Sequence, residues 1–223
     1  MLWWSEVDTP IGRVALGSSE RGLARVLLPN QLGERAAGFE DDGRNAEPAR
    51  QLAEYFAGER RVFDLALDVG GTEFQRRVWI EVAGIPYGRT RTYGEVARAL
   101  GVPRAHRAVG AANGDNPLPL VVPCHRVVGA GGDLVGYGGT TPVKRWLLAH
   151  EGAVPRQDEG FLAWGARRLA DQPSLLIGPR STRIFCRPTC RYGARIRHVP
   201  ALFDSAAEAI AEGYRACRVC QPA

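Results

Sequence analysis

Residues 92–114, TYGEVARALGVPRAHRAVGAANG, carry the pattern that decides the fold of this chain. Thr92 and Glu95 match the capping-box pattern, which predicts a short helix that stops at Gly101. A second helix is expected to open at Pro103 and to run to the end of the stretch. Two helices joined by a tight turn that contains glycine are typical of a helix-turn-helix.

The flanking segments predict a mixed fold whose character changes near residue 70. Residues 3–29 predict two or three short strands, and residues 48–58 predict an amphipathic helix. Beyond residue 70 the periodicity becomes helical, with another capping box at Thr72 and Gln75. The other expected segments are a loop over residues 33–48, a strand over 61–67, a helix from Thr141 to Gly152 and a connector over 153–172. The connector is expected to pack on a neighbouring part of the chain through Phe161, Leu162 and Trp164.

The net charge of +5 is distributed unevenly along the chain. Acidic residues outnumber Arg over residues 1–85, whereas Arg outnumbers acidic residues over 86–130 and over 173–223. Two basic regions behind an acidic front suit contacts with a phosphate backbone. There is no apolar run of about 18 residues and no signal-peptide pattern, so we expect a cytoplasmic protein that does not cross a membrane.

Cys124 stands beside His125 at the end of the proline-rich segment NPLPLVVPCHRV, residues 116–127. A free thiol has a pKa of about 8.5 and needs a base or a cation to become a nucleophile. His125 would supply that base through a water molecule, and Glu151 is the candidate carboxylate that orients the ring. The alternative, which a bare Cys-His pair favours, is an inert buried Cys beside a surface His.

The motifs around this pair resemble those of the O6-alkylguanine-DNA alkyltransferase family. Pro-Cys-His-Arg-Val preceded by Asn-Pro-x-Pro carries most of the resemblance, which covers roughly residues 1–152. The segments GIPYG at 84–88, TYGEV at 92–96 and LLAHEG at 147–152 follow in the family's order. The resemblance implies DNA repair by irreversible, single-turnover transfer of an alkyl group from O6-alkylguanine, and from O4-methylthymine, to Cys124. No organic cofactor is implied.

The resemblance also implies roles for individual residues. Cys124 is the acceptor, His125 and Glu151 form its activating relay, Asn116 ties the recognition helix to the active-site turn, and Tyr93 protonates the departing guanine. Three further residues are implied to face DNA: Tyr137 over the extruded base, Arg107 in the gap that the base leaves, and Arg126. A base inside the stack is out of reach of a thiol, so the lesion must be flipped out.

The resemblance implies that the second helix enters the minor groove, where one inserted side chain can kink DNA. The position of Arg107 in the middle of this helix, among small residues, favours its role as the inserted side chain. An ordinary contact to a phosphate is the alternative role for this side chain.

The other four cysteines form two close pairs, Cys186-x3-Cys190 and Cys217-x2-Cys220. Two such pairs predict a tetrahedral zinc site. The segments FCRPTC and CRVCQP resemble the zinc module of Ada-type methyltransferases over about residues 174–223. In that family the first of the four cysteines accepts methyl from methylphosphotriesters, so the resemblance makes Cys186 a candidate second acceptor, activated by the zinc. A purely structural zinc is the alternative.

Arginines beside the first cysteine pair are expected to hold a phosphate near the zinc: Arg180 and Arg183 ahead of Cys186, and Arg187 directly after it. The module follows the alkyltransferase part here, whereas in Ada it comes first, and the AraC-type region of Ada has no counterpart. An Ada-like methylation sensor that regulates by binding DNA is therefore the rival interpretation. A Cys-His hydrolase would need an oxyanion loop, which the sequence does not show.

Together these patterns predict an α+β protein. Its expected parts are a small RNase H-like α/β domain over residues 1–70, a helical, winged helix-turn-helix-like DNA-binding and active-site domain over 71–152, the connector over 153–172, and a four-cysteine zinc module over 173–223. The expected partner is double-stranded DNA that carries alkylated bases, and the protein is expected to be a monomer.

Overall fold

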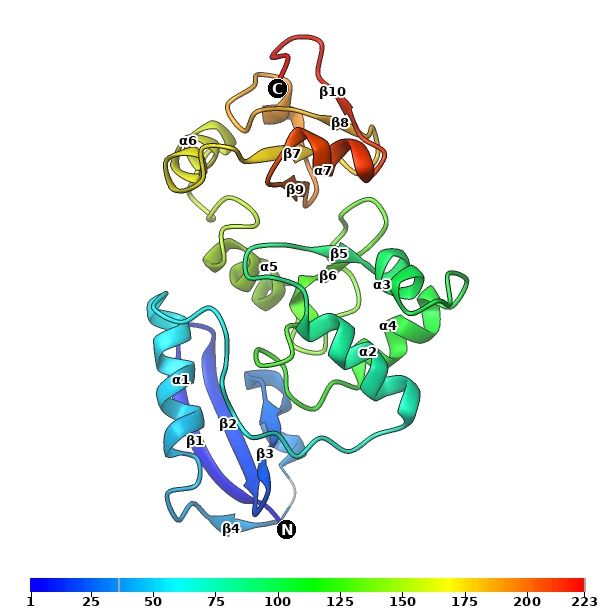
Figure 1. Ribbon diagram of the computed structural model, residues 1–223. Helices are drawn as coiled ribbons and strands as arrows, with labels where there is room; N and C mark the ends of the chain where they lie inside the picture. The colour runs from blue at the N-terminus through cyan, green and yellow to red at the C-terminus, as the bar shows by residue number, and fades with distance from the viewer. Residues whose placement is uncertain (36, 223) are drawn as a thin grey trace.

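The computed structural model describes residues 1–35 and 37–222, and it confirms the α+β fold. Three parts follow one another along the chain and are stacked in Figure 1, with the sheet of the N-terminal part at one end and the cysteine-rich part at the other. Within the described ranges, no helix combines the length and the apolar character that a bilayer span requires.

The N-terminal part is a four-stranded sheet in the order β3-β2-β1-β4. The first three strands form an antiparallel meander, and β4 pairs in parallel with β1. These strands are β1 (Trp3–Thr9), β2 (Gly12–Ser19), β3 (Gly22–Leu27) and β4 (Phe39–Glu40). The helix predicted over 48–58 is α1 (Ala46–Ala57), which ends where Gly58 adopts a left-handed φ of 81°. The segment predicted as a loop contains β4 and follows a 3-10 turn over Pro29–Glu34.

The predicted strand over residues 61–67 does not form. Leu67 makes only an isolated bridge to Leu23 of β3, beside a hydrogen bond from Leu23 N to Ala66 O of 2.9 Å. Farther along the same strand, Val26 N donates to Pro117 O at 2.9 Å. Two segments therefore share the free edge of β3, and neither has enough of it to build a ladder.

The helical centre contains α2 (Glu73–Ala83), α3 (Tyr93–Ala99) and α4 (His106–Gly114). Both predicted capping boxes are present, with Gln75 N donating to Thr72 Oγ1 at 3.2 Å and Glu95 N to Thr92 Oγ1 at 3.1 Å. Helix α4 begins three residues after Pro103, because a turn closed by Ala105 N and Val102 O precedes it.

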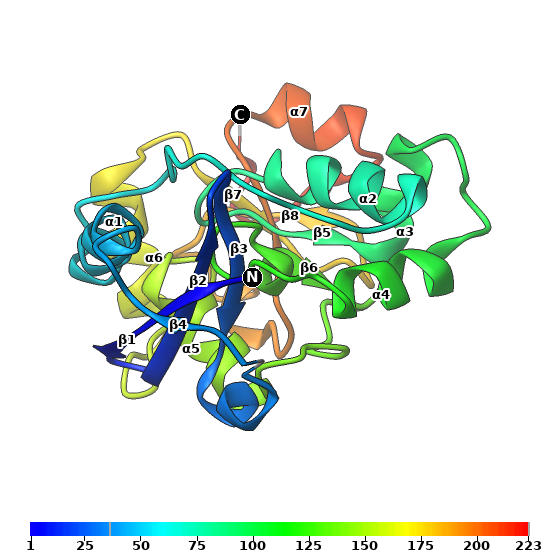
Figure 2. The ribbon, with the colours of Figure 1, turned by 90° about the horizontal axis from the view of Figure 1, so that it is seen from below.

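Two short parallel strands and one helix complete this centre: β5 (Arg91–Thr92), β6 (Val127–Val128) and α5 (Thr141–His150). Side chains from the sheet and from the helices form one hydrophobic core, which includes Val14, Leu16, Val78, Val96 and Leu147. In Figure 2, α1 and the helices α2 to α4 lie on opposite sides of β2 and β3.

The C-terminal part is built from α6 and two small two-stranded sheets, β7 with β9 and β8 with β10. Its elements are α6 (Phe161–Asp171), β7 (Leu176–Gly178), β8 (Ile184–Phe185), a 3-10 turn (Gly193–Arg195), β9 (Ala201–Phe203), α7 (Ala206–Ala211) and β10 (Arg215–Ala216). Helix α6 lies within the predicted connector. Phe161 and Trp164 pack on the core of this part as expected, whereas Leu162 is exposed.

Trp164 joins the C-terminal part to the helical centre. Its ring is fully buried beside Leu175 and Ile177, and its Nε1 donates to Gly152 O at 3.2 Å. The next residue, Gly165, approaches Pro188 so closely that an added Cβ would lie 2.5 Å from the Pro188 carbonyl oxygen. Helix α6 is therefore part of the wall around the first cysteine pair.

We expect Trp164→Ala to lower the free energy of unfolding by about 3–5 kcal/mol, because it leaves a large cavity and removes the bond to Gly152. Urea denaturation followed by circular dichroism measures this change. Leu162→Ala on the same helix is the control, since Leu162 is 49% exposed, and its effect should stay within about 0.5 kcal/mol. Equal losses for the two variants would contradict the docking role of Trp164.

Candidate active site and metal centre

Cys124 opens a short 3-10 turn over Cys124–Arg126, between Pro123 and β6. The proline-rich approach is tightly folded: Val122 N donates to Leu118 O at 2.8 Å, and Leu120 adopts a left-handed φ of 78°. Non-glycine residues persist in this conformation where the surrounding structure enforces it, often at functional sites. Cys124 is therefore only 5% exposed, and the folded backbone around it fixes its position.

Two asparagines hold this turn. Asn116 braces it from within, since its Nδ2 donates to Val122 O at 2.8 Å and its Oδ1 accepts from Leu118 N at 3.0 Å. The resemblance implied that Asn116 ties the recognition helix to this turn, but the tie from α4 is made by Asn113, whose Nδ2 donates to Cys124 O at 3.4 Å. The signal that could have identified Asn113 is its polar amide in a segment made otherwise of Ala, Val and Gly.

His125 and Glu151 meet as expected. His125 Nε2 lies 2.8 Å from Glu151 Oε1, and both side chains are inaccessible to solvent. Burial lowers the pKa of His125, so the neutral ring donates from Nε2 to the carboxylate. His125 Nδ1 is then a lone-pair acceptor, and it has no hydrogen-bond partner among the described residues.

Glu151 collects further donors that the sequence did not reveal. Tyr55 from α1 donates to Oε1 at 2.9 Å, and Gly88 N donates to Oε2 at 3.1 Å. Arg126 forms a two-pronged ion pair with it, at 2.8 and 2.9 Å, and also donates to Ile85 O. The expectation that Arg126 faces DNA is therefore wrong. Its side chain is buried, and its charge is paired with that of Glu151.

These contacts set the ionisation of the site. Burial alone would raise the pKa of Glu151, but the His125 ring and the Arg126 guanidinium hold it far below its usual range. Burial raises the pKa of the Cys124 thiol, although the Asn116 amide and the Lys144 charge oppose the rise. At neutral pH the site therefore holds a neutral thiol beside a neutral imidazole and a carboxylate.

Lys144 is a site residue that sequence reasoning missed. It is fully buried, and its Nζ donates to Val127 O at 2.6 Å and to Val135 O at 2.8 Å. Burial lowers its pKa to about 8. The sequence did set Lys144 apart, because it is the single Lys among 29 Lys and Arg residues.

The two tyrosines lie near the thiol on different elements. Tyr93 begins α3, and its hydroxyl lies 3.1 Å from the carbonyl oxygens of Val135 and Gly136. Burial and the neighbouring Cys124 raise its pKa to about 12. The hydroxyl of Tyr137 is buried and has no hydrogen-bond partner among the described residues. Its pKa is raised strongly, mainly by burial and to a smaller extent by the neighbouring Cys124.

Arg107 is exposed in the first turn of α4, not in the middle of a helix as the sequence suggested. The later start of the helix moves it toward the N-terminal end, where it stands free of the site.

The four C-terminal cysteines converge as predicted. Their sulfur atoms all lie within 4.8 Å of one another, and Cys186, Cys190 and Cys217 are buried. This donor set fits one tetrahedral ion, since Zn–S bonds are about 2.3 Å long. Backbone hydrogen bonds to Ile177 and Phe185 hold Cys186 and Cys217 in register.

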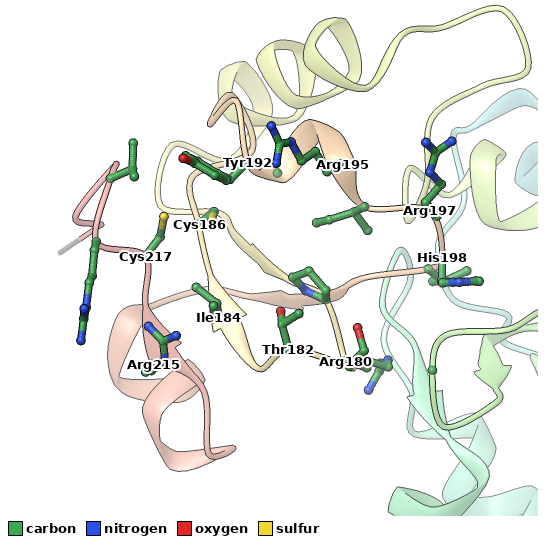
Figure 3. A pocket seen from close by; sticks show the side chains of 18 residues that line it. Arg180, Thr182, Ile184, Cys186, Tyr192, Arg195, Arg197, His198, Arg215 and Cys217 are labelled. Atoms are coloured by element: carbon green, nitrogen blue, oxygen red, sulfur yellow. The ribbon is translucent and has the colours of Figure 1, made fainter.

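A cavity of about 500 Å³ opens beside this cluster. Figure 3 shows Cys186 and Cys217 at one end of it and Arg197 and His198 at the other. The cavity walls carry five arginines: Arg180, Arg195, Arg197, Arg215 and Arg218. Of the arginines expected to hold phosphate, Arg180 does not serve in that way, because its charged group is buried against Glu95.

Comparisons with known proteins divide the chain in the same order. Residues 2–69 match the family model of the 6-O-methylguanine DNA methyltransferase ribonuclease-like domain, and residues 73–153 match that family's DNA-binding domain. Residues 164–223 match the metal binding domain of Ada.

Curated relatives agree. The methylated-DNA–protein-cysteine methyltransferase of Mycolicibacterium paratuberculosis is 48% identical over 153 residues, which are 68% of this chain and 93% of the relative. That of Methanosarcina acetivorans is 43% identical over 155 residues, which are 68% of this chain and 99% of the relative. A solved Mycobacterium tuberculosis OGT in complex with DNA is 47% identical, with a TM-score of 0.63 and coverage of 66% of this chain and 91% of that one.

We expect Glu151→Gln to lower the free energy of unfolding by about 3–5 kcal/mol at pH 7, because Arg126 keeps its buried charge without a counter-ion. The carboxyl pKa is depressed by folding, so its contribution to stability is complete above about pH 4.3 and is lost as the pH falls further. Urea denaturation at pH 7 and at pH 3 should therefore show a difference between wild type and variant that shrinks in acid. The exposed Glu59→Gln is the control; a Glu151 difference that grows in acid would refute the assignment.

Proposed function

Because the chain belongs to the methylated-DNA–protein-cysteine methyltransferase family and carries an Ada-type metal-binding domain, we propose that Cys124 takes an alkyl group directly from O6-alkylguanine in duplex DNA. The observation that supports this most is the buried His125, which directly follows Cys124 in the chain: its Nε2 bonds the Glu151 carboxylate, and its Nδ1 has no hydrogen-bond partner in the described part of the chain. A ring held in this tautomer is ready to accept a proton. O4-methylthymine presents the same kind of electrophilic methyl and is the second proposed substrate.

In the proposed step, a bond forms between Cys124 Sγ and the alkyl carbon as the bond from that carbon to O6 breaks. The electron pair of the broken bond stays on guanine. The thiol proton passes through a water to His125 Nδ1, while the Tyr93 hydroxyl protonates the leaving guanine. His125 then releases its proton to solvent, and Tyr93 regains one from solvent. The sum moves the thiol proton to guanine. The thioether has no easy route back, so each molecule reacts once.

The lesion reaches Cys124 only after it leaves the base stack. Arg107, exposed in the first turn of α4, would occupy the gap in the duplex, and Tyr137 would line the pocket for the extruded base. Tyr93 must turn from the carbonyl groups of Val135 and Gly136 toward the base before it can donate. Lys144, which donates to the same Val135 carbonyl oxygen, would hold that segment in place.

Duplex DNA that contains O6-methylguanine should add the mass of one methyl group to the peptide that contains Cys124, since the sulfur is the only acceptor in the step. Intact-mass and peptide mass spectrometry after a single incubation measure this. Cys124→Ser is the control and should leave the lesion in place. Repair of more than one lesion per molecule, or full repair by the variant, would refute the proposal.

For the metal-binding part we propose a zinc ion held by Cys186, Cys190, Cys217 and Cys220. The part is small for a self-sufficient core, so metal binding would supply much of its folding free energy. Four thiolates around one Zn²⁺ leave a net charge of −2, which keeps the sulfurs nucleophilic without a base.

We further propose Cys186 as the acceptor of a methyl group from a methylphosphotriester. Cys186 lines the arginine-walled cavity, which supports access for a phosphate-like group. A methylphosphotriester is neutral, so the thiolates would not repel it as they repel an ordinary phosphodiester. A purely structural zinc is the competing role, and the low exposure of Cys186 favours it.

DNA with methylphosphotriesters but no O6-methylguanine should methylate Cys186 in a Cys124→Ala background, because the cavity leads to its sulfur. Peptide mass spectrometry and zinc content are the measurements. Cys190, which does not line the cavity, is the internal control and should stay unmodified. An unmodified, zinc-loaded protein would leave the structural role alone.

A further inference from the structure

The C-terminal part docks on the element that carries Tyr93. In Figure 1, β7 and β9 lie directly beyond β5, which precedes α3. The main contact is Arg180, in the turn between β7 and β8, whose side chain is 5% exposed. Arg180 belongs to the C-terminal part, whereas its partners Glu95 and Thr90 belong to the helical centre.

Arg180 makes four hydrogen bonds there. Its Nη1 donates to Glu95 Oε1 at 2.8 Å and to Oε2 at 3.0 Å, and its Nη2 donates to Thr90 O at 2.8 Å and to Thr90 Oγ1 at 3.1 Å. A planar guanidinium can fill both sites at once, which an ammonium group cannot. Contacts of this kind to a charged partner are among the stronger hydrogen bonds in proteins.

The Glu95 carboxylate has a second duty. Its Oε2 accepts from Thr92 N at 2.6 Å, which is one half of the capping box that starts α3. Arg180 therefore clamps the residue that closes the first turn of this helix. Tyr93 is the first residue of that turn, and its position depends on how the turn is held.

The same part of the chain also holds the segment that faces the Tyr93 hydroxyl. Val199 N donates to Gly132 O at 3.1 Å, and His198 lies 3.2 Å from Asp133. An added Cβ on Gly132 would lie 2.3 Å from Val199 O, so the backbones are in close contact. Both walls around Tyr93 are thus supported from the metal-binding part.

We propose that Arg180 is a positioning residue for the alkyl transfer at Cys124: it fixes Glu95 and Thr90, and through them Tyr93, so that the metal-binding part completes the alkyltransferase site within one chain. This inference rests on the proposed function of Cys124. The curated relatives described above are matched over 93% or more of their own length by the first two thirds of this chain, so this support is an addition to the shared site.

The test measures the first-order rate of methyl transfer to Cys124 in the full chain at saturating O6-methylguanine duplex. Arg180→Ala should slow transfer about tenfold, by removing hydrogen bonds to a charged group. DNA affinity and zinc content should stay close to wild type. The loss of a buried ion pair lowers the melting temperature of the variant, so all rates are compared at a temperature at which every variant is fully folded. Arg180→Lys should restore part of the rate, and Glu95→Gln, on the other side of the contact, should reproduce the loss.

Two comparisons separate positioning from a merely structural role. Arg167→Ala removes a two-pronged bond to Glu159 that does not touch α3, and should leave the rate unchanged. In a Tyr93→Phe background, Arg180→Ala should cause little further loss, since both changes act on the same hydroxyl. Equal fractional losses in both backgrounds, or no loss at all, would overturn the inference. A wild-type chain that fails to methylate Cys124 would instead overturn the proposed function, and this inference with it.

Discussion

The buried carboxylate of Glu151 is the interaction on which the rest of this structure depends. It stands just after α5 and accepts hydrogen bonds from Tyr55 of the N-terminal part, from the Gly88 backbone, and from His125 and Arg126 of the active-site turn. A buried carboxylate is costly unless such donors surround it. The same contacts that make its burial tolerable therefore also fix where α1, the active-site turn and α5 meet.

Glu151 also determines the tautomer of His125 in the active-site turn. Because Glu151 stays ionised, the ring carries its proton on Nε2, which faces the carboxylate, and a lone pair on Nδ1. Burial raises the pKa of the thiol, so that it is protonated at rest. Asn116 and Asn113 then hold the backbone of the turn, so that this arrangement does not depend on a mobile loop.

Two ion pairs and one buried hydrogen bond connect the metal-binding part to the helical centre. Arg180 bonds Glu95, Arg89 pairs with Asp204, and Trp164 donates to Gly152, which directly follows Glu151. The part that holds the four-cysteine cluster is thus attached directly to the part that holds Cys124. Buried contacts of this kind transmit strain more readily than a flexible linker would.

The sequence by itself determined the elements and motifs that local rules control. Capping boxes at Thr72 and Thr92, the cysteine spacing, and the Cys124-His125 pair were all readable, because each depends on residues close in the chain. Only the tertiary structure decided that Arg126 and Arg180 are buried partners of carboxylates, that Lys144 lies beneath the site, and that residues 61–67 form no strand. Each of these outcomes depends on a group supplied by a distant segment, and local propensity cannot reveal which segment neutralises a charge or occupies the edge of a strand.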